Sequence, residues 1–362
     1  MLTLKMENPS VLLYGPLEAR IENRPLPTIR DPNDVIVRIA YTGVCGSDVH
    51  FWLNGGIRTF VSESAPLVMG HEACGTVHAV GSGVTTLRPG DRVAIEPGIP
   101  CRRCQRCKAG RYNLCPYMAF AADPPHTHGT LTKFFRVSAD FCYKIPDSLN
   151  IREGILLEPL AVAVHAVRLA DIKPGHQVVV FGAGTVGLFC AAVAKEFGAS
   201  VVVSVDLLPN KLEVAKKLIG EEVSKIWIPD SSLAPEENAQ QLKDLHGLGE
   251  GAHVVIDATG AEPSVQTAMY TLQPGGTYVQ AGMGKRKIEF PIAELCEREL
   301  SIKGCFRYGP GDFELAMSLV QRGRIQLAAL VTGEFSFEHA SEAWESTRRG
   351  EGIKNVIRGP GG

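Results

Sequence analysis

The chain has 362 residues, 45% of them hydrophobic and 21% charged, which is the balance of a soluble globular protein long enough for two domains. Its formal charge of −2 provides no basic field for a nucleic acid or an anionic membrane, so we expect a small-molecule partner. The sequence has no run of about 18 apolar residues and no signal-peptide pattern, which predicts a cytoplasmic protein. Its ten cysteines are then expected to be thiols or metal ligands rather than disulfides.

The pattern of apolar residues changes along the chain. From about residue 8 to 150, short β-like runs are interrupted by Gly, Pro and Asp turns. From about residue 176 to 300, continuous apolar runs alternate with helical stretches, which predicts βαβ units and a parallel sheet covered on both faces. The expected strands are 34–40, 75–80 and 92–95 in the first part, and 177–181, 200–205, 254–256 and 277–281 in the second.

The tail after residue 309 contains a helix-like run at 313–322 and a strand-like run at 354–358. The parallel sheet is expected to be complete before this tail begins. We therefore expect the tail to pack back on the first domain.

The glycine pattern of Gly182-Ala-Gly184-Thr-Val-Gly187 lies between an expected strand and the Ala-rich helical run 188–197. In a dinucleotide-binding fold the first glycine permits a tight turn, the second lets the pyrophosphate approach the backbone, and the third lets helix and sheet pack closely. The helix N-terminus then faces the phosphates. A glycine turn with no ligand is the alternative, which the position between strand and helix disfavours.

A carboxylate 19 residues after Gly187, Asp206, ends the next expected strand, where it can accept hydrogen bonds from the adenosine ribose. It would repel a 2′-phosphate, and the following Leu207 and Leu208 offer no cation, so NAD is favoured over NADP. Lys211 is near enough in the sequence to soften that preference. The residues assigned to cofactor binding are Gly182, Gly184, Val186, Gly187, Asp206 and Lys211.

A second set of residues has the chemistry of a catalytic metal site. Cys45, His71, Glu72 and Glu158 all lie close to expected element ends. One sulfur, one imidazole and one or two carboxylates, together with water, make a four-coordinate zinc site with an open position, as a catalytic zinc requires.

The motif Gly70-His71-Glu72-x-x-Gly75-x5-Gly81-x-x-Val84 resembles the zinc-containing alcohol dehydrogenase signature of the medium-chain dehydrogenase/reductase superfamily. The resemblance covers essentially the whole chain. Leu157-Glu158-Pro159-Leu160 and His71-Glu72 are similar to the polyol (sorbitol and xylitol) dehydrogenase branch. Further likeness to this branch is found in the stretches 95–100, 112–116, 118–122 and 306–309.

This resemblance implies roles for individual residues. Cys45, His71 and Glu72 would surround the zinc, with Glu158 either a direct ligand or hydrogen-bonded to the zinc-bound water. Arg307 would reach the hydroxyls of the polyol. Ser47 and His50 would occupy proton-relay positions, although Glu158 and a water could do the same task. The side chains of Phe51, Trp52 and Phe120 would line the substrate cleft, with plain core packing the equal alternative.

Four further cysteines follow the spacing C-x2-C-x2-C-x7-C, which can wrap one tetrahedral metal inside a single loop; they are Cys101, Cys104, Cys107 and Cys115. Four thiolates leave no open position, so we interpret the site as a structural zinc. A nucleic-acid zinc module lacks its recognition-helix pattern here, and an Fe–S cluster favours a shorter last gap. His126 and His128, in a Pro-rich stretch, resemble another ligand pair but are expected to lie in a surface or cleft-edge loop.

The predicted fold is α/β, with a β-rich GroES-like catalytic domain over 1–157 and 300–362 and a Rossmann NAD-binding domain, a doubly wound parallel sheet, over 158–299. The predicted function is NAD-dependent oxidation of a polyol to a ketose, with xylitol to D-xylulose first and sorbitol or L-arabinitol as alternatives. The alcohol oxygen would bind zinc as an alkoxide while hydride passes to NAD. A non-enzymatic nucleotide-binding protein on this fold is the alternative from another class. The resemblance implies two zinc ions per chain and a homotetramer or dimer.

Overall fold

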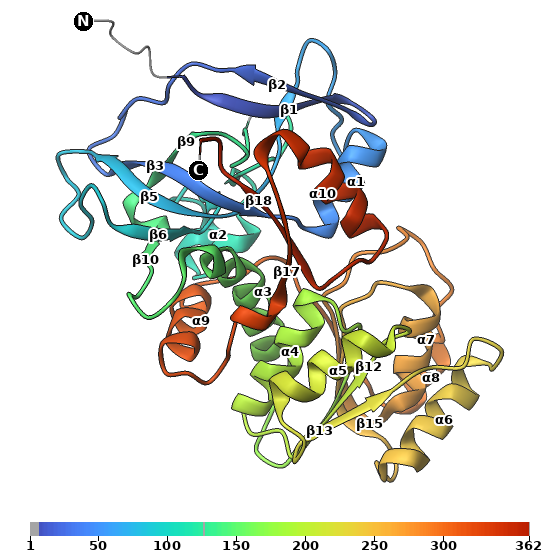
Figure 1. The fold of residues 1–362 in the computed structure, drawn as a ribbon. Coiled ribbons are helices and arrows are strands. Elements are labelled where there is room, and N and C mark those ends of the chain that lie inside the picture. The colour runs from blue at the N-terminus through green and yellow to red at the C-terminus, as the bar shows by residue number, and fades with distance from the viewer. Residues whose placement is uncertain (1–6, 126, 362) are drawn as a thin grey trace, which may run out of the picture. The chain divides into compact units, whose positions relative to one another are not determined.

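The computed structural model describes residues 7–125 and 127–361, so His126 lies outside the described residues. The chain divides into two compact units. Unit 1 consists of Met1–Glu158 and Leu327–Gly362, and unit 2 of Pro159–Gln326 (Figure 1).

Unit 1 is built on a mostly antiparallel sheet. Its central strand, β3 (Asp34–Gly43), pairs with β5 (Glu72–Val80) on one side and with β18 (Lys354–Arg358) on the other. In the described residues the sheet runs β10-β6-β5-β3-β18-β17, with β9 also on β3. The other strands of this sheet are β6 (Arg92–Ile95), β9 (Phe134–Ser138), β10 (Cys142–Lys144) and β17 (Val331–Phe335).

Two smaller sheets and several helices complete unit 1. A sheet of order β2-β1-β4 contains β1 (Pro9–Gly15), β2 (Glu18–Asn23) and β4 (Leu67–Val68), and β7 (Gly98–Ile99) pairs with β8 (Ala119–Phe120). The α-helices of unit 1 are α1 (Gly46–Asn54), α2 (Gln105–Lys108) and α10 (Ala340–Arg348), and α3 (Leu157–Ala170) begins here and continues into unit 2.

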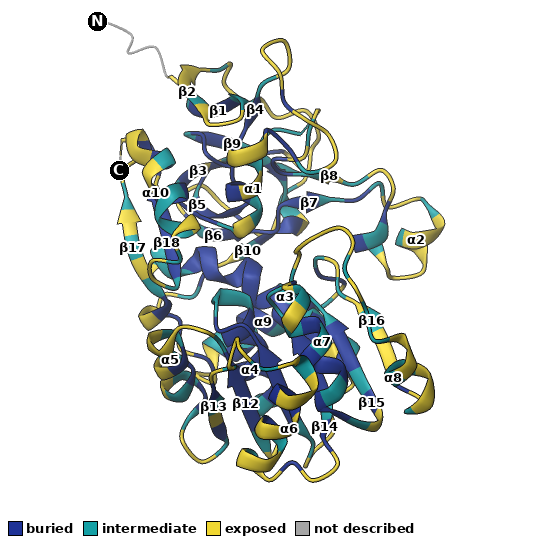
Figure 2. Cartoon of the chain, turned by 90° about the vertical axis from the view of Figure 1, so that its right-hand side faces the viewer, coloured by how far each residue is buried: buried dark blue, intermediate teal, exposed yellow. Residues whose placement is uncertain are grey.

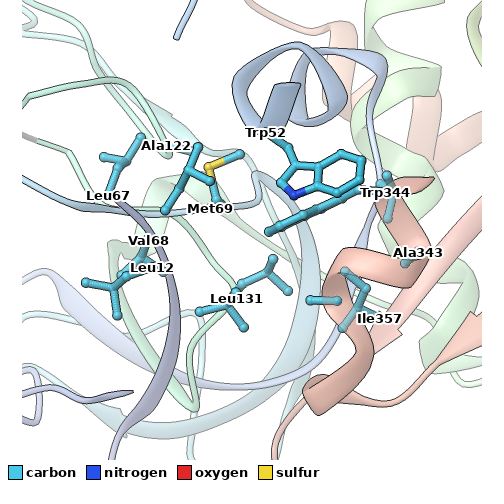
Figure 3. Close-up of a cluster of buried hydrophobic side chains, with 14 of the residues drawn as sticks. Leu12, Trp52, Leu67, Val68, Met69, Ala122, Leu131, Ala343, Trp344 and Ile357 are labelled. Carbon is cyan, nitrogen blue, oxygen red and sulfur yellow. The ribbon is translucent and has the colours of Figure 1, made fainter. Parts of the chain in front are cut away.

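The core of unit 1 joins segments from both ends of the chain. Helices α1 and α10 lie side by side, and the ring centroids of Trp52 and Trp344 are 6.1 Å apart (Figures 1 and 3). Met69 and Ile357 belong to the same buried cluster. Trp52 is therefore a core residue, which settles the choice between core and cleft that the sequence left open for it.

Unit 2 contains the predicted parallel sheet. Among the described residues it runs β13-β12-β11-β14-β15-β16, and every neighbouring pair is parallel. Its central strands are buried, whereas the helices around them show exposed outer faces (Figure 2). The strands are β11 (Gln177–Phe181), β12 (Val201–Val205), β13 (Ser224–Trp227), β14 (Ala252–Asp257), β15 (Leu272–Gln280) and β16 (Ser301–Gly304).

The helices of unit 2 follow the strands as a doubly wound fold requires. They are α4 (Thr185–Glu196), α5 (Pro209–Ile219), α6 (Pro235–His246), α7 (Glu262–Thr271), α8 (Ile292–Glu297) and α9 (Asp312–Gln321). Strand order and connections confirm the predicted α/β fold with its Rossmann-type sheet.

The second predicted domain boundary differs from the division in the structure. The sequence placed it at residue 300, but β16 pairs with β15 as the edge strand of the parallel sheet, so the sheet is not complete before residue 300. Helix α9 also belongs to unit 2, and only the chain from Leu327 onward returns to unit 1. The expectation that the whole tail packs on the first domain was therefore wrong for residues before Leu327.

A membrane crossing requires a helix that is both long and apolar. In the described part of the chain, no helix meets both requirements.

Candidate active site

Cys45, His71 and Glu72 converge in unit 1. One ligand atom from each lies within 4.8 Å of the others, and both His71 and Glu72 are buried. Cys45 precedes α1, while His71 precedes β5 and Glu72 begins it, so the pairing of β3 with β5 brings together residues from separate parts of the chain. A thiolate, an imidazole and a carboxylate at this separation fit a divalent zinc ion.

Asp48 supports this group, although the sequence reading did not single it out. Asp48 is 2% exposed, and one of its carboxylate oxygens accepts a hydrogen bond from the Cys45 backbone N–H at 2.9 Å. The other oxygen lies 3.6 Å from Nδ1 of His71. Burial alone would lower the pKa of His71, but the Asp48 carboxylate and Cys45 outweigh it and raise that pKa. A carboxylate behind a histidine orients the ring and makes it a stronger metal ligand.

Lys354 is a second residue that the sequence reading missed. Its buried Nζ donates to both carboxylate oxygens of Glu72, at 2.6 and 2.8 Å, and to the Val44 carbonyl at 3.0 Å. Burial alone would lower the pKa of Lys354, whereas the nearby Glu72 and Cys45 raise it, and the net direction is upward. Gly43 leaves room for this contact, because a Cβ there would lie 2.2 Å from a Glu72 oxygen. Lys354 therefore holds the Glu72 carboxylate from the side of β18.

The remaining predicted residues of this site are placed less closely. Glu158 is buried in the first turn of α3 and is close enough to raise the pKa of Lys354, but it is outside the group of ligand atoms within 4.8 Å of one another. Ser47, half-buried, and His50, exposed, lie three residues apart on α1, and such residues share a helix face. Their relay role stays a prediction.

The second predicted metal group is also assembled. Cys101, Cys104, Cys107 and Cys115 each offer a sulfur within 4.8 Å of the others. Backbone N–H groups of Cys101 and Cys104 point at sulfurs of the group, at 3.4 and 3.3 Å. Hydrogen bonds from the backbone of Arg103, from the backbone of Cys104 and from neighbouring cysteines of the group together lower the pKa of Cys101 to about 6. Sulfurs that are this close and receive N–H donors fit one tetrahedral zinc ion.

The cysteine loop is anchored to unit 1 by a buried carboxylate. Glu96 is 0% exposed and accepts hydrogen bonds from the hydroxyl of Tyr112, within the loop, at 2.6 Å and from that of Tyr143, on β10, at 2.8 Å. The loop and the main sheet are therefore connected by a hydrogen-bonded group as well as by the backbone.

The glycine turn in unit 2 has the shape that a dinucleotide requires. Gly182 has φ +95°, a conformation that residues with a Cβ rarely adopt. A Cβ at Gly187 would lie 1.8 Å from the Gly182 carbonyl oxygen, whereas a Cβ at Gly184 would meet no protein atom within 4 Å. Gly184 is also the N-cap of α4. The open space at Gly184 lies beside a helix N-terminus, where a pyrophosphate would bind.

Asp206 contacts this turn directly. The Asp206 carboxylate accepts hydrogen bonds from the backbone N–H of Ala183 at 2.7 Å and of Leu208 at 2.9 Å. Val186 is in the first turn of α4, and Lys211 is half-buried in α5. The carboxylate is thus held at the carboxyl end of β12, where the ribose of NAD is expected.

Arg307 follows β16 in unit 2 and adopts φ +58°. Its guanidinium carbon lies 4.7 Å from the centre of the Phe306 ring. Its predicted contact with the polyol stays a prediction.

The parallel-sheet unit with its glycine turn, and the unit that carries two groups of candidate metal ligands, are the arrangement of a two-unit dehydrogenase. Residues 31–147 match the alcohol dehydrogenase GroES-like domain, and residues 185–322 match the zinc-binding dehydrogenase domain. The chain belongs to the zinc-binding dehydrogenase family, whose members are oxidoreductases.

Individual relatives agree with this assignment. A protein of Aspergillus clavatus named probable D-xylulose reductase A is 52% identical over 353 residues, covering 98% of this chain and 97% of that protein. The structure of an Escherichia coli oxidoreductase/dehydrogenase of unknown specificity has a TM-score of 0.89 at 32% identity and covers 98% and 99% of the two chains. L-Idonate 5-dehydrogenase from Escherichia coli has a TM-score of 0.86 at 27% identity, with 98% of each chain covered.

Proposed function

We propose that this protein oxidises a secondary alcohol of a polyol to a ketose with NAD, and that its substrate is xylitol, which yields D-xylulose. The observation that carries the proposal is the near full-length identity of 52% to a protein named as a D-xylulose reductase, in a chain where Cys45, His71 and Glu72 converge. Sorbitol and L-arabinitol are the alternative substrates, since a few side chains decide polyol stereochemistry.

The residues of this chain divide the chemistry between them. Bound zinc would lower the pKa of the alcohol oxygen, and bound NAD would accept the hydride. Cys45, His71 and one carboxylate, Glu72 or Glu158, would hold the metal, with Asp48 fixing the His71 ring. The other carboxylate, or Ser47 with His50, would accept the proton that the alcohol loses.

Other residues would select substrate and cofactor. Arg307 would hydrogen-bond the additional hydroxyls of the chain, which penalises an alcohol that lacks them because buried donors are then left unpaired. Asp206 would favour NAD by repelling a 2′-phosphate. Cys101, Cys104, Cys107 and Cys115 would hold a second, structural zinc ion.

A non-enzymatic nucleotide-binding protein on the same fold is the candidate from another class. Loss of catalysis in such a relative is expected to remove a metal ligand or to break the glycine turn, and this chain retains both. The cytoplasmic location and the homotetramer or dimer remain predictions, and the mass of the purified protein in solution tests the assembly.

The decisive experiment is the initial rate of NADH formation from xylitol, sorbitol, L-arabinitol and ethanol, with NADP as a parallel arm. Each rate is measured before and after zinc removal by a chelator, and again after zinc is restored. We expect zinc-dependent NADH formation from xylitol, with ethanol much slower. No signal from any polyol, in protein that is folded and zinc-loaded, would favour the non-enzymatic alternative.

A further inference from the structure

Arg307 has an unusual backbone conformation for a residue with a long side chain. Its φ of +58° is in the left-handed region, which costs free energy for residues other than glycine. Among the described residues Arg307 shares a positive φ with five others that are not glycine, and such a conformation persists when the surrounding structure imposes it. The contacts around Arg307 therefore show what maintains it.

Three contacts in unit 2 hold the chain on either side of Arg307. Before it, the Cys305 N–H donates to the Gln280 carbonyl at 2.8 Å, which extends the pairing of β16 with β15. After it, the ring of Tyr308 is buried edge-on against Phe313, with centroids 5.3 Å apart at 81°. The Gly309 N–H then donates to the Asp312 carboxylate at 2.6 Å.

Asp312 is the centre of this arrangement. It is 1% exposed at the start of α9, where the N-terminal end of a helix favours a negative charge. The oxygen that accepts from Gly309 also contacts Nδ1 of His165 at 2.8 Å. The other oxygen accepts from the Arg168 guanidinium at 2.5 Å, and Arg168 also donates to the Pro310 carbonyl at 3.3 Å.

His165 and Arg168 are three residues apart on α3, so they present their side chains on one face of a rigid element. The segment that follows Arg307 is thus bonded through two of its backbone groups to a charged network based on two helices. A buried carboxylate with a cationic partner holds such bonds more firmly than neutral groups do.

We propose that Asp312, His165 and Arg168 form a positioning network that fixes the backbone of Arg307 for recognition of the polyol hydroxyls. The proposal rests on the proposed function, because it assigns Arg307 to the substrate. Without the network, the segment from Phe306 to Pro310 relaxes toward an ordinary φ and the guanidinium moves, so hydroxyl recognition weakens. A displacement of about 1 Å is enough to reduce such recognition severely.

The test combines Asp312→Asn with Arg307→Ala. Wild type, both single variants and the double variant are compared in kcat and KM for xylitol and in Kd for NADH. We expect each single variant to raise the xylitol KM about tenfold, the worth of a well-placed hydrogen bond, with the NADH Kd within about twofold of wild type. The xylitol KM of the double variant should be no higher than that of Arg307→Ala alone, because the network acts through Arg307.

Variants of His165 separate a positioning role from general stability. His165→Asn keeps a donor for Asp312 and should stay within about twofold of the wild-type xylitol KM, whereas His165→Leu should resemble Asp312→Asn. These variants also serve if Asp312→Asn fails to fold. The matched control is Lys216→Met, which removes the exposed ion pair with Glu213 on α5, elsewhere in unit 2, and should leave the xylitol KM unchanged.

Three results would overturn the network. The first is an unchanged xylitol KM in folded Asp312→Asn and His165→Leu. The second is a double variant in which the effects of the two single substitutions on the xylitol KM add. The third is an NADH Kd that rises as much as the xylitol KM. A wild-type protein that forms no NADH from any polyol overturns the proposed function itself, and this arm is measured first so that the two failures are distinguished.

Discussion

At the residue scale, the candidate metal group depends on charges that are buried together. Glu72 is 1% exposed and Lys354 is 4% exposed, so the charge of each side chain is offset mainly by the opposite charge of the other. Removing one partner from such a pair leaves an uncompensated buried charge. Lys354 is 282 residues away from Glu72 in the sequence, and no local motif marks it.

We predict that Lys354→Met destabilises the protein by about 3–5 kcal/mol, because the Glu72 carboxylate loses its cation. Denaturant unfolding of the zinc-free protein measures this change, because a bound zinc ion could itself offset the charge of Glu72. Lys173→Met, which removes a surface ion pair with Asp171, is the control and should change stability by less than about 1 kcal/mol. A zinc competition titration of both variants then shows whether a released Glu72 binds the metal more tightly. Equal stabilities in the two variants would contradict the assigned role of the buried pair.

His128 is expected to make the stability of the protein depend on pH. Burial, together with the charge of Arg24, lowers its pKa from 6.5 to about 4, and its Nδ1 accepts a hydrogen bond from the Val68 N–H at 3.1 Å. Between these two pH values the unfolded chain binds the proton that the folded protein excludes, so stability falls as pH decreases from 6.5 to 4. His128→Asn keeps an acceptor for Val68 and should reduce this fall.

The measurement is the urea midpoint of wild type, His128→Asn and the control His339→Gln, each at several pH values between 4 and 7. His339 is a surface histidine and its variant should follow wild type. If His128→Asn keeps the full wild-type pH dependence, other groups cause the loss of stability.

At the element scale, two glycines of the same turn have different surroundings, so one is expected to matter for folding and the other for cofactor binding. Gly187 faces the carbonyl of Gly182 at a distance that allows no side chain, whereas Gly184 faces open space. The order of strand, turn and helix was predictable because apolar periodicity and glycine spacing are local. Strand β16 could not be predicted in this way, since it consists of four residues, Ser301-Ile-Lys-Gly304, that are mostly exposed at a sheet edge. It is recognised only by its pairing with β15.

We predict that Gly184→Ala folds normally but binds NADH at least about tenfold more weakly, because its methyl group occupies the space expected for the pyrophosphate. Gly187→Ala should instead lower the stability of unit 2, since its Cβ would lie 1.8 Å from the Gly182 oxygen. Thermal unfolding and NADH fluorescence titration measure both properties. If Gly184→Ala binds NADH as tightly as wild type does, the pyrophosphate does not bind against Gly184.

At the scale of the whole molecule, the two metal groups belong to unit 1 and the glycine turn to unit 2. Cys107 lies on α2, which has no buried residue, whereas Tyr112 and Cys115 of the same loop are packed on unit 1. A bound metal would therefore stabilise the α2 part of this loop most.

We predict that Cys107→Ser lowers the zinc content from two ions per chain to one and increases proteolysis within 101–115. NADH binding should be retained, because the residues of the turn lie in another unit. Metal analysis, limited proteolysis and NADH titration test the three parts. The matched control is Cys296→Ser, an exposed cysteine outside both metal groups, which should retain two zinc ions. If Cys107→Ser still binds two zinc ions per chain, the cysteine loop is not a metal site.

The fold class and the glycine turn could be predicted from the sequence alone, because each depends on local spacing and periodicity. The same is true of the two groups of candidate metal ligands, which a few short motifs mark and which the folded chain brings together apart from Glu158. The folded chain was needed to show that β16 and α9 belong to the parallel-sheet unit, that Asp48 and Lys354 contact the candidate metal ligands, and that Asp312 joins His165 to the segment after Arg307. These contacts join residues far apart in the chain, through side-chain charges and strand pairing that leave no periodic signal. Their partners are defined only when the folded chain buries them together.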